Sequence, residues 1–156
     1  MKFILLDKVL SIEPGRRIES VKALSLAEEY LGDHFPSFPV LPGVLMVEGL
    51  LQTAAMLVRV TNDFRQSMIV LQEARNVKYK SFVKPGSLVR MEVQAKTIEE
   101  QSSSFVGTCY VGDRPMVEAR LKLRHYNLAD ENPQWQAVDA RIIREMKLRA
   151  QLVGAC

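Results

Sequence analysis

The sequence predicts an α+β fold in which a curved antiparallel sheet wraps around one buried helix. Residues 44–60 are apolar on every side of a helix, which is typical of a helix buried in a core. The only polar side chains in that run are Glu48, Gln52, Thr53 and Arg59. After residue 67 the period becomes that of strands. Since nothing else in the chain could cover the helix, we expect the sheet to do so.

Composition indicates one ordinary domain. The chain has 156 residues, of which 47% are apolar and 25% charged. A net charge of +3 falls short of the dense Lys and Arg clusters of dedicated nucleic-acid binders. Cys109 and Cys156 offer no disulfide framework, and the two histidines are far apart, so we expect a reducing compartment and no metal or cofactor.

Neither apolar segment of the sequence favours a membrane. The N-terminus has an apolar stretch of only four residues before Asp7, too short for a secretory or spanning segment. Residues 44–60 carry a central glutamate and glutamine and fall short of the roughly 20 apolar residues that a bilayer requires. We expect a cytoplasmic protein with no membrane or nucleic-acid partner.

The elements before the long helix have local signals. Residues 16–24 predict a first strand. Ser25 and Glu28 have the S-x-x-E spacing of a capping box, which predicts a short helix over 25–32. The connector 34–42 is stiff, because Pro36, Pro39 and Pro42 restrict their own backbone and that of the preceding residue.

The elements after the long helix are strands and one further helix. Alternation predicts an antiparallel meander over 68–83, 87–100, 103–112 and 114–126, with turns at 84–86 and 112–113. We expect residues 1–126 to form the main domain. Residues 127–156 form a C-terminal extension, packed on the same domain or on a partner, in which Asn132 caps an amphipathic helix. Its apolar positions are Trp135, Val138, Ile142, Met146 and Val153.

Candidate chemistry is concentrated in residues 32–52, GDHFPSFPVLPGVLMVEGLLQ. His34 can act as a base. Burial raises the pKa of a carboxyl such as Glu48 toward that of a useful acid, although the helix N-terminus opposes this shift. Gly43 offers a backbone N–H without an intrahelical acceptor, which can hold an oxyanion. Together these groups suit removal of a proton beside a carbonyl and departure of a hydroxyl, which is dehydration.

Structural roles are the alternatives for each residue. His34 can be a loop histidine without a role, and Glu48 a buried hydrogen-bonding side chain. We expect His125 to be structural or solvent-facing and Cys109 to be a small core side chain.

The segment HFPSFPVLPGVLMVEGLLQ resembles the HFPGxPxxPGVLxxEAxxQ signature of the 3-hydroxyacyl-acyl-carrier-protein dehydratases, the FabZ/FabA hot-dog family of type II fatty acid synthesis. ILLDKVL and VKYKSFVKPGSLVRMEV are similar to two further family segments. The resemblance covers residues 3–125 and leaves the C-terminal helix outside. It implies a hot-dog fold, in which the sheet wraps the central helix.

The resemblance also implies a mechanism. His34 matches the catalytic histidine that takes the C2 proton of a (3R)-3-hydroxyacyl thioester, and Gly43 matches the glycine whose N–H holds the thioester oxygen. Glu48 matches the acid that protonates the leaving hydroxyl, so that a trans-2-enoyl thioester and water result. Glutamate at 48 is the FabZ choice and favours dehydration without isomerisation. Gln52 matches the family's helix glutamine.

The partners implied by the resemblance are a second copy of the chain and an acidic acyl carrier protein. Family members form dimers or trimers of dimers, and each site takes its histidine from one protomer and its acid from the other. Basic residues that could dock the carrier are Lys78, Lys80, Lys84, Arg120, Lys122 and Arg124. Ordinary solvated strand positions are the alternative for each of them.

Departures from the signature lie beside the histidine. Ser37 and Phe38 replace small or polar residues, and Ser81-Phe82 replaces Arg-Pro. We expect Phe38 to narrow the acyl tunnel or its mouth. The residues expected to contact substrate are Phe38, Val44, Gln52, Tyr79 and Phe82. A hot-dog acyl-CoA thioesterase and a non-catalytic acyl-binding or regulatory hot-dog protein are the alternative functions.

Overall fold

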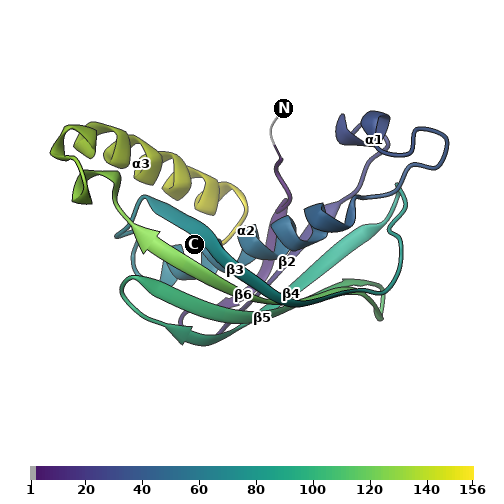
Figure 1. Cartoon of the computed structure of the whole chain (residues 1–156), viewed down its shortest axis with the longest axis horizontal. Coiled ribbons are helices and arrows are strands. Elements are labelled where there is room, and N and C mark those ends of the chain that lie inside the picture. The colour runs from purple at the N-terminus through teal and green to yellow at the C-terminus, as the bar shows by residue number, and fades with distance from the viewer. Residues whose placement is uncertain (1–2) are drawn as a thin grey trace.

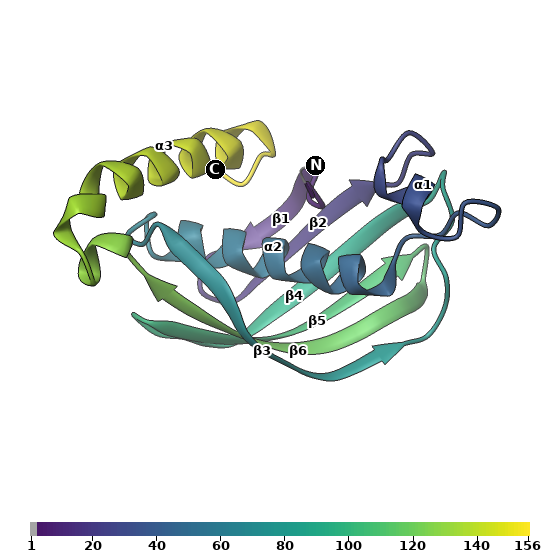
Figure 2. The same cartoon turned by 45° about the horizontal axis from the view of Figure 1, so that its top comes forward.

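The computed structural model, which describes residues 3–156, contains a six-stranded antiparallel sheet that curves around one long helix (Figures 1 and 2). The strand order is β1-β2-β4-β5-β6-β3. The strands are β1 Lys8–Glu13, β2 Arg17–Ala23, β3 Met68–Tyr79, β4 Leu88–Ile98, β5 Ser102–Val111 and β6 Arg114–Tyr126. The helices are α1 Tyr30–Asp33, α2 Gly43–Thr61 and α3 Gln136–Leu152, with 3₁₀ turns η1 Leu128–Asp130 and η2 Pro133–Trp135. The predicted α+β hot-dog layout is confirmed.

Burial of α2 against the sheet forms the core. Leu50 and Leu57 are fully buried, and the inward-facing residues of β5 and β6 pack in the same apolar cluster. Gly107 on β5 allows close approach, because a Cβ there would lie 3.1 Å from a methyl carbon of Leu50. Although α2 is long and apolar enough to cross a membrane, 56% of its most apolar window is buried inside the protein, as in a core helix.

The N-terminal strand β1 was missed by the sequence analysis. Its pairing with β2 shifts register between Val9 and Ser11, which breaks the alternation that identifies a strand. The strands β3, β4 and β6 lie within the predicted segments, and β5 begins one residue before its own; Gly86 and Gly112 adopt positive φ in the two predicted turns.

The helix predicted over 25–32 is wrong, because only Tyr30–Asp33 is helical. The capping box does not form. Ser25 Oγ accepts from the N–H of Ala27, whereas the Glu28 carboxylate turns to Lys22 Nζ at 2.7 Å. That ion pair withdraws the carboxylate from the backbone N–H it would have capped.

The C-terminal helix α3 is anchored at both ends. Near its start, the Asp139 carboxylate accepts the backbone N–H groups of Leu128 and Ala129 at 2.9 Å and the hydroxyl of Ser67. After its end, the carbonyl of Val153 accepts from the N–H of Val9 at 2.7 Å. Asn132 caps the 3₁₀ turn η2 and not α3 itself. Helix α3 therefore lies against the end of α2 opposite to α1 (Figure 2).

Candidate active site

His34 lies in a strained loop directly after α1. The imidazole is half-buried and packs edge-on against the ring of Phe35, with 4.4 Å between ring centroids. Phe35 itself has φ of 49°, an uncommon value for a residue with a bulky side chain. A turn in which the Phe38 N–H donates to the Phe35 carbonyl at 2.8 Å holds this conformation. Backbone strain of this kind is concentrated at functional sites.

Gly43 begins α2, and the ring of Tyr79 lies over it. A Cβ at this position would come within 2.6 Å of Tyr79 Cε1, so any side chain would displace the ring. As the first helical residue, Gly43 has an N–H with no intrahelical acceptor. The helix start thus presents a hydrogen-bond donor beside an aromatic ring.

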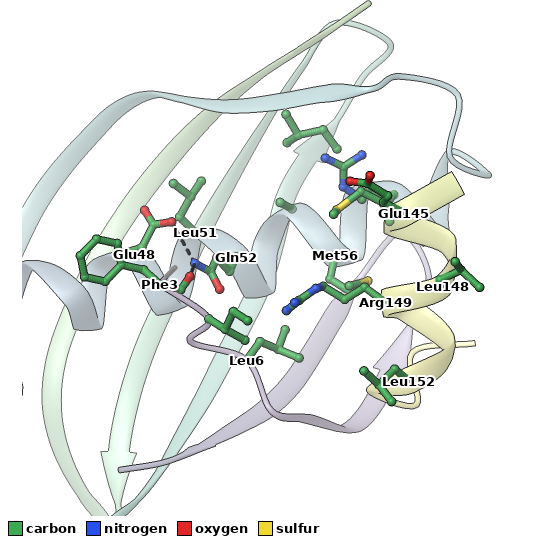
Figure 3. A pocket seen from close by; sticks show the side chains of 15 residues that line it. Phe3, Leu6, Glu48, Leu51, Gln52, Met56, Glu145, Leu148, Arg149 and Leu152 are labelled. Atoms are coloured by element: carbon green, nitrogen blue, oxygen red, sulfur yellow. Dashed lines mark hydrogen bonds between the residues drawn. The ribbon is translucent and has the colours of Figure 1, made fainter. Parts of the chain in front are cut away.

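Glu48 is held by a short hydrogen-bonded chain. Gln52, one turn further along α2, donates from Nε2 to Glu48 Oε1 at 3.0 Å and to the carbonyl of Phe3 at 2.8 Å. Gln52 Oε1 in turn accepts the N–H of Leu5 at 2.9 Å. Figure 3 shows Gln52 between Glu48 and Phe3. The amide therefore ties the carboxylate to the N-terminal segment, which limits its rotation.

A cavity of about 710 Å³ lies beside Glu48 (Figure 3). One wall is the face of α2 from Glu48 to Arg59, together with Ile69 of β3. A second wall is the N-terminal segment, with Phe3, Ile4 and Leu6, and α3 supplies a third. The cavity is thus lined mainly by apolar side chains, with a fixed carboxylate near one end and Arg59, Glu145 and Arg149 at the other.

The expected site residues form two groups in one chain. Glu48 and Gln52 line the cavity, whereas His34 and Gly43 do not. The latter lie at the N-terminal end of α2, where four expected substrate residues are exposed: Phe38, Val44, Tyr79 and Phe82. A single chain therefore does not bring the expected base into the cavity of its own acid.

The two aromatic departures from the signature contact each other. The rings of Phe38 and Phe82 pack edge-to-face with 6.3 Å between centroids, and Lys84 Nζ lies 5.6 Å from the centroid of Phe38. Phe38 does not line the cavity of its own chain.

The six basic residues expected at a carrier-docking surface are all exposed, but they do not form one patch. Arg120, Lys122 and Arg124 alternate on β6 with side chains buried against α2, so they point to the outer face of the sheet, away from the cavity. Lys80 pairs with Glu118 at 2.9 Å, and Lys78 lies opposite Glu118 in the register. Lys84 lies beside Phe38 and is the candidate nearest to the aromatic pair.

The sequence analysis missed the far end of the cavity. Arg59 is buried, and its guanidinium donates to the carbonyls of Gln66 and Ser67 at 3.3 and 3.1 Å. Burial lowers the pKa of Arg59 to about 10, so it stays charged at neutral pH. The residues of α3 at this end are Glu145, Met146, Leu148, Arg149 and Leu152. A short-range pattern carries no signal for such a contact, because Glu145, the first of these α3 residues, follows Arg59 by 86 positions.

His125 is buried and structural. Its Nδ1–H donates to the Glu100 carbonyl at 3.3 Å, and Nε2 accepts from the Ser103 hydroxyl at 2.7 Å. Burial lowers its pKa. Within residues 3–156, no three His, Cys, Asp or Glu side chains lie close enough together to hold a metal ion.

Comparison with known proteins identifies the family. Residues 1–120 match the family model of the FabA-like domain. The chain belongs to this family. Among FabA-like relatives, a protein named 3-hydroxyacyl-[acyl-carrier-protein] dehydratase FabZ from Symbiobacterium thermophilum is 33% identical over 131 residues, covering 84% of this chain and 92% of the relative. A FabZ from Pelotomaculum thermopropionicum is 34% identical over 119 residues, covering 76% and 85%.

Solved structures with low identity share the fold of this FabA-like chain. The dehydratase heterocomplex ApeI:P from Xenorhabdus doucetiae superposes with a TM-score of 0.73 at 17% identity, covering 86% of this chain and 90% of that one. The protein smu.793 from Streptococcus mutans, solved with acetyl CoA, gives a TM-score of 0.59 at 12% identity, covering 81% and 93%. The hot-dog fold expected from the sequence is thereby confirmed.

Proposed function

We propose that this FabA-like protein is a 3-hydroxyacyl-acyl-carrier-protein dehydratase, a hydro-lyase of fatty acid biosynthesis closer to FabZ than to FabA. The observation that carries the proposal is the Glu48–Gln52 pair in an apolar cavity. Relatives named FabZ support it, at 30% identity or more over most of the chain. No cofactor enters the reaction.

In the proposed reaction, the imidazole of His34 takes the C2 proton of a 3-hydroxyacyl thioester. Charge develops on the thioester oxygen and is held by the N–H of Gly43. Glu48 then gives its proton to the C3 hydroxyl, which leaves as water while the C2–C3 double bond forms. The proton taken by His34 returns to Glu48 through solvent or product release, which resets the site.

The proposal requires two protomers. His34 lies outside the cavity that Glu48 lines in its own chain, so a second copy must supply the imidazole. Strand β3 offers a place for that copy. It is the last strand of the sheet, twelve residues long, and among residues 3–156 it pairs only with β6. A free edge of this length favours pairing with another strand. We propose a dimer joined at β3, or a trimer of such dimers.

The carrier protein is proposed to dock near the N-terminal end of α2. Lys84 and the exposed rings of Phe38 and Phe82 lie near the start of α2, because the N–H of Leu41 donates to the carbonyl of Val83. An acidic carrier would be guided there by Lys84, with Lys78 and Lys80 behind it. We further propose that residues 1–126 carry the catalytic domain, with 127–156 as its extension, and that the protein works in the cytoplasm.

The test is turnover of purified protein with 3-hydroxyacyl-carrier protein, followed as enoyl product or as hydration in reverse. We expect the single variants His34→Ala and Glu48→Gln each to lose about 10²- to 10⁴-fold in kcat, the usual contribution of acid–base groups. Lys122→Ala, on the outer face, is the matched control. An inactive wild type, or unchanged turnover in both variants, would refute the proposal. Hydrolysis of acyl-CoA in place of dehydration would indicate the thioesterase.

A further inference from the structure

The end of the cavity farthest from Glu48 is built by α3, which lies outside the family match at residues 1–120. Five α3 residues line this end, and Figure 3 shows α3 standing across the end of the α2 face. The helix is a fixed wall, because Asp139 ties its start to η1 and Val153 ties its end to β1.

The α2 face gives the length of the cavity. Glu48 and Arg59 are eleven residues apart, which is roughly 16 Å along a helix. The side chains between them are Leu51, Gln52, Ala55 and Met56, and Leu6 and Ile69 flank this face. An extended acyl chain that starts at the acid fits this apolar groove, on the order of ten carbons long.

Arg149 is the unusual group in this groove. Its side chain extends from α3 toward the N-terminal segment and into the cavity (Figure 3). The other charged groups at this end have partners, since Glu145 faces Arg141 at 4.0 Å and Arg59 binds two carbonyls. Across the described part of the chain, the Arg149 guanidinium makes no hydrogen bond or ion pair with protein.

An unpaired guanidinium at this place must keep its water. An apolar chain that reached it would remove that water and return no hydrogen bond, which is costly. A chain that stops short leaves the guanidinium hydrated. The penalty therefore rises abruptly with one or two further methylenes at the position of Arg149.

We propose that α3 closes the acyl site of this enzyme and that Arg149 limits the length of the acyl chain to on the order of ten carbons. The inference rests on the proposed function. It assigns to the C-terminal extension a role in specificity that is separate from the proton transfers at His34 and Glu48.

The experiment measures kcat/KM for 3-hydroxyacyl-carrier proteins of increasing even chain length. Arg149→Met keeps the length of the side chain and removes the charge. We expect its ratio of long-chain to short-chain kcat/KM to rise about tenfold, through a lower KM for the long chains. Arg149→Lys keeps the charge and should retain the wild-type ratio. Arg144→Met, on an exposed position of the same helix, is the matched control.

The possible outcomes distinguish failure of the proposed dehydratase function from failure of the proposed role of Arg149. A wild type inactive at every chain length refutes the proposed function, and this inference with it. Wild-type turnover with the same ratio in Arg149→Met, folded by circular dichroism, refutes the inference alone. The inference is also refuted if the wild type has the same kcat/KM for long acyl chains as for short ones.

Discussion

At the scale of single residues, the site depends on polar side chains that hold others in place. Gln52 uses both ends of its amide, one on Glu48 and Phe3 and the other on Leu5. A carboxylate that must donate a proton to one substrate atom gains from such restraint, because misorientation by about 1 Å can cost two orders of magnitude in rate.

Replacing Gln52 by alanine tests this restraint. We expect kcat to fall about tenfold with little change in KM, because Glu48 loses the hydrogen bond that orients its carboxylate. The free energy of unfolding should fall by about 1 to 3 kcal/mol, since the N–H of Leu5 and the carbonyl of Phe3 lose their partner. Urea unfolding measures this change. Gln151→Ala, exposed on α3, should alter neither quantity.

His125 predicts a dependence of stability on pH. Burial lowers its pKa in the folded protein, a shift that the charge of Arg59 reinforces. The unfolded chain then binds the proton more tightly, so stability is fully present above about pH 6.5 and falls as the pH drops below that value. The slope from this residue is at most about 1.4 kcal/mol per pH unit.

The measurement is urea unfolding at a series of pH values below about 6.5, where the unfolded chain binds the proton of His125 more tightly than the folded one. His125→Gln should flatten the curve over this range, because an amide can replace both hydrogen bonds but does not titrate. His34→Gln removes the only other histidine of the sequence and serves as the comparison. If the free energy of unfolding had the same slope against pH in wild type and His125→Gln, His125 would not be the source of the pH dependence.

At the scale of elements, α3 depends on one carboxylate. Asp139 is buried, and burial alone would raise its pKa, but hydrogen bonds from Ser67, Ala129 and Leu128 outweigh burial and lower it. The charged form is thus the one that holds η1, α3 and the loop before β3 together. The stability of the cavity's end wall follows from this cluster.

Asp139→Ala should loosen α3 without unfolding the sheet. We expect a loss of roughly 2 to 4 kcal/mol in the free energy of unfolding, because two backbone N–H groups lose a charged acceptor. Hydrogen exchange should rise in α3 and η1 and stay slow in β5 and β6. Glu131→Ala, in the same region but exposed, is the comparison. Faster hydrogen exchange in the sheet as well as in α3 would show that α3 does not unfold separately from the sheet.

At the scale of the whole molecule, the division between His34 and the Glu48 cavity is the main feature. One chain supplies both residues but does not bring the histidine into the cavity. Strand β3 leaves one edge of the sheet open for a second copy. A two-fold dimer would complete two identical sites at once.

Mixing inactive variants tests this division. When His34→Ala and Glu48→Gln chains are co-expressed, each mixed dimer should contain one intact site and one doubly altered site. Random pairing then restores about a quarter of wild-type activity, while each variant alone stays inactive. Mixing either variant with a double variant should restore none. No recovery, despite mixed dimers shown by mass spectrometry, would place both residues in one chain.

Elements with strong local periodicity were predictable from the sequence. The apolar run 44–60 and the alternating runs of β4, β5 and β6 determine their own secondary structure, because burial selects helix or strand through side-chain period. The signature residues His34, Gly43 and Glu48 could be named from residue types and spacing alone. The stiff loop and the helix start that carry them were also evident from Pro36, Pro39 and Gly43.

Only the tertiary structure decided the remaining features, because they depend on competition between distant groups. Lys22 takes the Glu28 carboxylate from the expected capping box, and a bulge hides β1 from pattern analysis. The contact of Phe38 with Phe82 joins positions 44 residues apart. The meeting of Arg149 with the face of α2 follows from chain folding and from no local preference. The sequence by itself thus determined the long helix, the strands β2 to β6 and the residue types available at the candidate site, whereas packing decided where the cavity ends.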